Sequence, residues 1–375
     1  MFLRKNKEII ILLLSVFFSL FIAAIILEIY FSKSFVLSHT SSKFDPDLGW
    51  ANIPGSVTID RGKTISINSF GYRGKEVDLS KKHIVYIGDS IVFGTGVSDT
   101  ETGAYLLNKK IRGYQVINLS VSGYGIDQYY LRLEKELKRL NPSMIIVNIY
   151  PGNDFGETLS GESYGYEKPV FNIDKSSLTK KSVNANFVDH RKVKLLKDKI
   201  SRFSCLNQFS RFWVSRHPIF KSFKDKFCRT TRIPFSEADY LITALLMKFS
   251  VLARKHNSKL SFILSATRSD FSYKVADPEF FGIYKFLKLF SNNKTIPPAA
   301  YSSMARISFK RIFHNFKNRY NFLYPFVYYD FYDYLEKNNV PEESIFLEGD
   351  VGHLSPTGHK IMADFIIENL KSHGD

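Results

Sequence analysis

The sequence has few of the residues that hold metal-stabilised or disulfide-rich modules together. Its 375 residues include two cysteines, Cys205 and Cys228, and no Cys/His spacing resembles a zinc site. We therefore expect no metal. Outside the cytoplasmic membrane the two thiols can form one disulfide, which we favour over a redox role. Two buried free thiols are the alternative.

Acidic residues are scarce relative to basic ones, with 36 against 52 and a formal charge of +16. Such an excess is typical of proteins that bind nucleic acid, anionic lipid or acidic polymers. A genome biased toward Lys, Asn, Phe and Ile explains it equally well. No zinc-knuckle, helix-turn-helix or aromatic RNA-binding signature accompanies the charge, so we expect no nucleic-acid partner.

The longest apolar run lies near the N-terminus. Residues 9–27 carry no charge, and nineteen residues at 1.5 Å each nearly span a hydrocarbon core of about 30 Å. Arg4, Lys5 and Lys7 precede the run, which places the N-terminus in the cytoplasm and the rest outside, periplasmic or extracellular. A cleaved signal peptide is the competing interpretation, but no small-x-small site follows the run. We predict an uncleaved single-pass anchor over residues 1–31.

The rest of the chain alternates between buried strands and amphipathic helices. Strands are predicted at 83–87, 114–118, 144–150, 259–265 and 326–331, and helices at 100–111 (capped by Thr100), 127–140, 236–255 and from 355 on. Strands that alternate with helices of this length predict an α/β fold with a central parallel sheet and helices on both faces.

Two segments interrupt this alternation. Residues 32–80 are rich in turn-forming combinations and predict a stalk and an irregular lead-in to a domain over 81–375. Residues 155–235 carry 17 Lys/Arg against 7 Asp/Glu and predict a hairpin at 167–180 and basic helices at 192–216. We interpret this stretch as an insertion that caps the sheet or faces a partner, with a solvated basic face as the alternative.

Three residues have the chemistry of a serine hydrolase. Ser90, in Gly88-Asp89-Ser90, directly follows a predicted strand, and ligands of open α/β sheets gather at the carboxyl ends of strands. A serine hydroxyl needs a base to attack a carbonyl. Asp350-x-x-His353 supplies one, because this spacing lets the carboxylate orient the imidazole. His359, six residues further on, is expected to be a structural partner in the last helix.

An acyl-transfer site also needs donors for the oxyanion. Gly123 follows the second predicted strand, and its missing side chain lets a backbone N–H approach a substrate. Asn153 follows the third strand and offers an uncharged amide donor. The backbone N–H of Ser90 is the third candidate. Gly and Asn are also common turn residues, so each alone is weak support.

These residues together resemble the SGNH (GDSL-type) serine hydrolase family, whose blocks run Gly-Asp-Ser, a glycine, Gly-x-Asn-Asp and Asp-x-x-His. The resemblance covers about residues 83–155 and 240–372, and it implies a flavodoxin-like three-layer sandwich without metal or other cofactor. Two positions depart from the pattern: Ile91 replaces the usual leucine, and Gly152 adjoins Asn153 directly. The lead-in at 44–74 is similar to that of membrane-anchored bacterial members.

We predict a membrane-anchored serine ester hydrolase or O-acyltransferase with Ser90, His353 and Asp350 as the triad. The resemblance implies acyl esters as substrates, in particular acetyl esters of envelope glycans. The sequence does not distinguish hydrolase from transferase and does not indicate an oligomeric state. The alternative is a non-catalytic envelope protein that binds an acidic glycan or a protein partner through the basic stretch.

Overall fold

The computed structural model describes residues 14–23, 42–163, 166–174, 177–181, 235–272, 298–320, 323, 325–350 and 352–372. The chain divides into two units, which we describe separately. One comprises residues 1–40 and 186–229, of which the structure describes a helix at 14–23. The other comprises residues 41–185 and 230–375 and contains everything that follows.

The larger unit is built on a parallel sheet of five strands. These are β5 (Lys82–Ile87), β6 (Tyr114–Asn118), β7 (Met144–Ile149), β12 (Lys259–Leu264) and β13 (Val327–Asp330). The strand order across the sheet is β13-β12-β7-β5-β6. Counted along the chain this is the 2-1-3-4-5 order of doubly wound sheets, whose switch point lies between the first and third strands. The predicted parallel α/β sheet is therefore confirmed.

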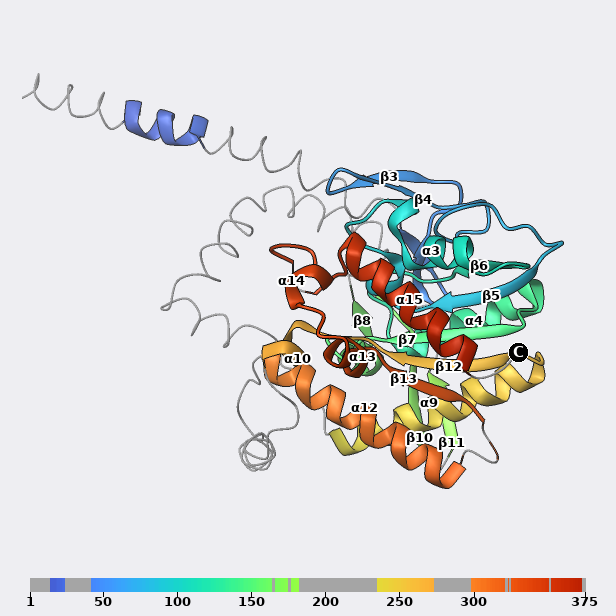
Figure 1. The fold of residues 1–375 in the computed structure, drawn as a ribbon. Helices are drawn as coiled ribbons and strands as arrows, with labels where there is room; N and C mark the ends of the chain where they lie inside the picture. Colours follow the sequence, from blue (N-terminus) through green and yellow to red (C-terminus); the bar gives the residue numbers. More distant parts are fainter. Residues whose placement is uncertain are drawn as a thin grey trace, which may run out of the picture. The chain divides into compact units, whose positions relative to one another are not determined.

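Helices cover both faces of the sheet (Figure 1). On one face α3 (Gly103–Lys110) packs beside α15 (Pro356–Ser372). On the other, α4 (Ile126–Leu140) and α12 (Pro298–Tyr320) both pack against α9 (Phe235–Lys255).

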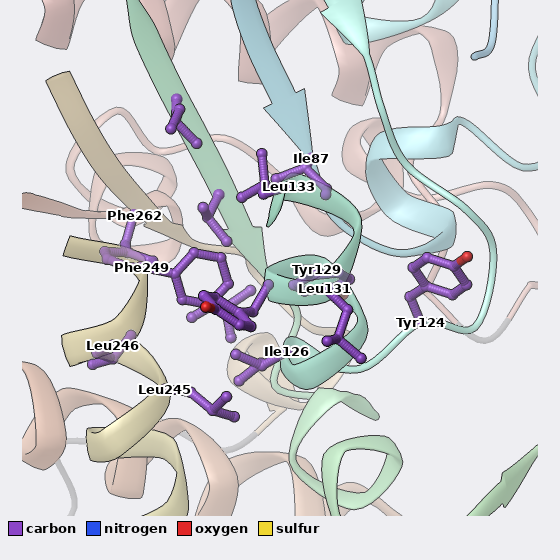
Figure 2. Close-up of a cluster of buried hydrophobic side chains, with 14 of the residues drawn as sticks. Ile87, Tyr124, Ile126, Tyr129, Leu131, Leu133, Leu245, Leu246, Phe249 and Phe262 are labelled. Atoms are coloured by element: carbon purple, nitrogen blue, oxygen red, sulfur yellow. The ribbon is translucent and has the colours of Figure 1, made fainter. Parts of the chain in front are cut away.

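Alternate residues of each strand point into two separate cores. Ile87 and Phe262 belong to the core under α4 and α9, which Figure 2 shows with Leu133 and Phe249 among the gathered side chains. Ile84 and Ile263 belong to the core under α3 and α15. Strands buried on both faces explain why the sequence shows continuous apolar runs here instead of alternation.

The lead-in differs from the prediction of irregular structure. Residues 42–66 form two antiparallel hairpins, β1 (Ser42–Asp45) with β2 (Gly49–Asn52) and β3 (Val57–Asp60) with β4 (Lys63–Ser66). Four-residue strands are too short to produce a clear periodic pattern in the sequence, which is why only their turns were recognised. This segment belongs to the same compact unit as the sheet.

The shorter elements connect or flank these layers. They are α2 (Ser90–Phe93), η1 (Asp99–Glu101), α5 (Asp154–Leu159), β8 (Glu162–Ser163), β9 (Tyr166–Glu167), β10 (Val170–Asp174), β11 (Ser177–Lys181), α10 (Arg268–Ser272), α13 (Phe331–Lys337) and α14 (Glu342–Ile345). The predicted hairpin at 167–180 is confirmed as β10 paired with β11. The predicted cap at Thr100 was wrong: Thr102 caps α3, because Glu101 completes a capping box with Ser98 and ends a separate turn.

Several predictions fall partly or wholly outside the described residues. They concern both cysteines, the basic helices at 192–216 and the two ends, 9–13 and 24–27, of the apolar run. Among the residues that are described, no helix is both long enough and apolar enough to cross a membrane.

Candidate active site

Ser90 is the first residue of α2, separated by two residues from the end of β5, which lies between β7 and β6 in the sheet. Asp89 is the N-cap of this helix, and its carboxylate accepts the backbone N–H of Ile91 at 2.9 Å. A side chain at Gly88 would lie 2.6 Å from Val92 Cγ2 and 3.1 Å from the Asn148 carbonyl oxygen, so only glycine fits this turn. The tight turn holds the Ser90 side chain at the carboxyl end of the sheet.

Asp350 and His353 come from the loop that precedes α15, and His353 lies 263 positions after Ser90 in the chain. His353 Nε2 lies 2.9 Å from Ser90 Oγ, and His353 Nδ1 lies 2.7 Å from Asp350 Oδ1. The same carboxylate oxygen accepts the backbone N–H groups of Gly352 at 2.9 Å and His353 at 2.8 Å. A continuous hydrogen-bonded chain therefore connects the carboxylate, the imidazole and the hydroxyl.

The carboxylate of this chain is held in its charged form. Burial by itself would raise the pKa of Asp350, but its hydrogen bonds and its attraction to His353, together with the hydrogen bond from Arg61, outweigh burial. The pKa of Asp350 consequently lies well below its usual range. An ionised carboxylate beside Nδ1 favours the tautomer that leaves Nε2 free to accept the Ser90 proton.

Two arginines that the sequence analysis missed hold the loop of Asp350. Arg268, in α10, donates to the Asp350 carbonyl at 3.1 Å, to the Leu347 carbonyl at 2.7 Å and to Glu342 at 2.7 Å. Arg61, in the β3–β4 turn, donates to Asp350 Oδ2. Neither contact has a signal in the sequence, because each joins residues at least 74 positions apart.

The other two predicted oxyanion donors, Asn153 and Gly123, follow the strands on either side of β5. Asn153 is the N-cap of α5 after β7, and its side chain lowers the pKa of Asp89, the residue before Ser90, against the effect of burial. Gly123 has φ +79° in the loop after β6. Next to it, Ser122 Oγ lies 3.2 Å from Thr95 Oγ1 in the segment that follows α2. All three candidate oxyanion donors thus follow strands at the carboxyl edge of the sheet.

The lead-in supports these loops. Trp50 Nε1 donates to the Ser122 carbonyl at 3.0 Å, and Asn52 Nδ2 donates to the Ser120 carbonyl at 3.3 Å. The buried guanidinium of Arg73 donates to three backbone carbonyls at the end of α2 and beyond, at 2.5 to 2.6 Å from Phe93, Gly94 and Val97. Residues 42–73 therefore form part of the framework of the site.

Burial shifts the pKa of three nearby titratable groups in the direction that favours the neutral form. Burial raises the pKa of Asp89, although the N–H of Ile91 opposes this, and burial raises the pKa of Asp154 well above its usual value. Burial also lowers the pKa of His359 to about 3, and its Nδ1 accepts the Gly103 N–H at 3.2 Å. His359 is a structural partner, as predicted. In the described ranges no three His, Cys, Asp or Glu side chains are grouped to hold a metal.

Comparisons with known proteins give structural neighbours only. The chain is similar to the crystal structure of TesA (12% identity, 78% of this chain and 99% of that chain, TM-score 0.40). It is similar to the psychrotrophic esterase EstA from Pseudoalteromonas sp. (13%, 78% and 97%, TM-score 0.37) and to an acetylxylan esterase from Geobacillus stearothermophilus (13%, 77% and 94%, TM-score 0.36). No family model matches the chain, and no curated protein does. These superpositions are too distant to assign an activity, which has to be argued from the site.

Proposed function

We propose that this protein is a serine ester hydrolase or acyltransferase with Ser90 as nucleophile, His353 as general acid and base, and Asp350 as the group that orients the imidazole. The observation that supports it is the hydrogen-bonded chain from Asp350 Oδ1 through both nitrogens of His353 to Ser90 Oγ, with separations of 2.7 and 2.9 Å. Both separations are within the range for proton transfer along a triad.

The reaction proceeds in two halves. Ser90 Oγ attacks the acyl carbonyl carbon as its proton moves to His353 Nε2, and the resulting tetrahedral intermediate carries the negative charge on the former carbonyl oxygen. The imidazolium then protonates the leaving alcohol, which leaves Ser90 acylated. In the second half His353 deprotonates the incoming acceptor, and Ser90 recovers its proton when the new product departs.

The backbone N–H groups of Ser90 and Gly123 and the amide of Asn153 are the donors that we propose for the oxyanion. The side-chain amide of Asn153 carries two N–H donors, so it can serve a substrate oxygen and a neighbouring carboxylate together. Mutational loss of one such donor typically lowers kcat by about 10²–10³-fold.

We further propose that the protein is anchored by residues 9–27 and acts outside the cytoplasmic membrane on acetyl esters of envelope glycans. The uncharged run and its preceding basic residues support the anchor, and the similarity to membrane-anchored SGNH members supports the substrate class. Whether water or a glycan hydroxyl accepts the acyl group decides between hydrolase and transferase. The alternative of a non-catalytic binding protein depended on the basic stretch at 155–235, most of which lies outside the described residues.

The test is hydrolysis of 4-nitrophenyl esters of increasing acyl length by the full chain and by Ser90→Ala. Ser143→Ala is the matched control, because it removes a hydroxyl that bonds the His83 carbonyl at the opposite edge of the sheet. A fluorophosphonate probe followed by mass spectrometry reports the nucleophile independently of the substrate. An acetylated glycan, offered with and without a sugar acceptor, separates hydrolysis from transfer.

We expect turnover and labelling in the parent and the Ser143→Ala chain, and neither in Ser90→Ala. The preferred acyl length then distinguishes an acetyl esterase from a lipase. Undiminished turnover or labelling in Ser90→Ala contradicts the mechanism.

A further inference from the structure

The β3–β4 hairpin closes with an arginine where the backbone favours another residue. Arg61 and Gly62 are the two residues between the paired Asp60 and Lys63, and their φ values are +51° and +76°. Two positive φ values define the primed turn of tight hairpins, whose first position favours Asn, Asp or Gly. A long side chain at a left-handed position is locally unfavourable, and such exceptions concentrate at functional sites.

The β3–β4 hairpin packs against α2, which begins at Ser90, and against the segment that follows it. The Ser66 N–H, at the end of the hairpin, donates to Asp99 at 3.0 Å. Ile65 and Ile67 form a small buried cluster with Phe93, the last residue of α2. The position of the turn is therefore fixed relative to Ser90.

The guanidinium of Arg61 lies close to two segments, the loop of Asp350 and the segment that follows α2. It donates to Asp350 Oδ2, and a Cβ placed on Gly96, in the segment after α2, would lie 3.7 Å from Arg61 Nη1. Asp350 Oδ1 already accepts three N–H groups. The guanidinium of Arg61 supplies a hydrogen-bond donor for the other carboxylate oxygen, Oδ2. The Arg61 side chain is 51% exposed, whereas that of Asp350 is 3% exposed. The arginine thus covers the carboxylate from the solvent side.

We propose that Arg61 is a positioning residue of the triad, which holds Asp350 with Oδ1 facing His353 and offsets part of its charge. The proposal depends on the proposed function, because it assigns Arg61 a role in the reaction of Ser90. It also gives the lead-in hairpin a role in catalysis in addition to its role in folding.

The sign of the effect follows from the charges around the imidazole. The groups that face Asp350 and His353 from the packed elements are Arg61, Arg268, Asp89, Tyr150 and His359. Burial keeps the last two neutral, since it lowers the pKa of His359 and raises that of Tyr150. Arg268 binds the Asp350 carbonyl, so Arg61 is the cation on the carboxylate itself. Without Arg61 the uncompensated carboxylate favours the imidazolium, and the acid limb of the rate profile moves to higher pH.

The experiment uses the full chain and three variants. Arg61→Asn removes the cation but creates an Asn-Gly turn, which suits the two positive φ values. Arg61→Lys keeps the charge. Lys63→Gln is the matched control, because it removes the neighbouring cation that pairs with Glu101. The readouts are melting temperature, kcat and KM for 4-nitrophenyl acetate between pH 5 and 9, and the low-field proton resonance of His353 Nδ1–H, assigned by its loss in His353→Gln.

We expect Arg61→Asn to melt no lower than the parent while its plateau kcat falls about 10-fold with little change in KM. Its acid limb should move up by about half a pH unit, because a half-exposed cation is partly screened. At a given pH on that limb, the rate should therefore fall about 3-fold. Arg61→Lys should restore the acid limb, and Lys63→Gln should leave kcat and the profile unchanged.

Two results would overturn the proposal. One is an Arg61→Asn chain whose rate profile and low-field resonance match those of the parent. The other is equal loss of activity in Arg61→Asn, Arg61→Lys and Lys63→Gln with lowered melting temperatures, which indicates a structural role alone. The resonance needs no turnover, so it tests Arg61 even if Ser90→Ala shows that the proposed function is wrong.

Discussion

Replacing Asp350 by Asn tests how the triad is oriented. The change removes a negative charge and converts one acceptor oxygen into an amide donor. Three N–H groups converge on Oδ1 at 2.7 to 2.9 Å, whereas Arg61 donates to Oδ2. An NH2 group at the Oδ1 position would face three donors, so we expect the amide oxygen to stay there and the NH2 group to face the guanidinium of Arg61.

This orientation determines the size of the effect. His353 Nδ1–H keeps an acceptor, so the tautomer that frees Nε2 toward Ser90 persists. The variant loses the attraction between the carboxylate and the imidazolium that forms in the transition state. At an effective dielectric constant of about 20, two unit charges about 4 Å apart attract by about 4 kcal/mol. The retained hydrogen bond reduces the loss to about 2–3 kcal/mol, or about 10²-fold in kcat/KM. A reversed amide would fix the wrong tautomer and cost about 10⁴-fold.

The assay compares kcat/KM for 4-nitrophenyl acetate in the parent, Asp350→Asn and the double variant Arg61→Asn/Asp350→Asn. The double variant removes the guanidinium that faces the new NH2 group, so we expect it to be at least as active as Asp350→Asn alone. A loss near 10⁴-fold in Asp350→Asn refutes the predicted amide orientation. Full activity refutes the role of Asp350.

Two further predictions concern stability. Lys168 and Asp127 form an ion pair at 2.5 Å with both side chains fully buried, so Lys168→Ala should lower the free energy of unfolding in urea by about 3–5 kcal/mol. Joint replacement by Met and Leu should recover most of that loss, and no recovery would contradict the desolvation argument. Because the pKa of His359 is lowered to about 3 in the folded chain, the unfolded chain alone takes up this proton as pH falls below about 6.5. The stability of the parent should therefore fall by up to about 1.4 kcal/mol per pH unit from that pH down to about 3, and His359→Gln should show a smaller slope in urea unfolding at pH 4.5 and 7. Equal slopes would contradict the assignment of His359 as a buried neutral side chain.

The sequence predicted the main strands because each one is a continuous apolar run bounded by turn residues. It also predicted α4 and α9 closely, since their apolar positions recur with the helical period over 15 and 21 residues. Short elements were less predictable. The β3 and β4 strands have four residues each, and η1 was merged with α3 because a Ser98–Glu101 capping box competes with the cap at Thr102.

Part of the candidate site could be predicted from the sequence. Ser90 follows a strand, and Asp350 and His353 lie three residues apart, so both halves have a local signal. Arg61 has none that identifies its partner. Its left-handed turn precedes Gly62, and an Arg-Gly pair between two short strands is only a turn signal until the contact with Asp350 is known.

The sequence by itself determined which segments are buried strands, which are amphipathic helices, and which polar residues follow the strands. These properties depend on neighbouring residues and on periodicity. Only the tertiary structure decided the strand order β13-β12-β7-β5-β6, the approach of His353 to Ser90 and the contact between the lead-in hairpin and Asp350. The last two contacts join positions 263 and 289 residues apart. They arise because helices must bury both faces of a twisted sheet with right-handed crossovers, and no local pattern of residues encodes that packing.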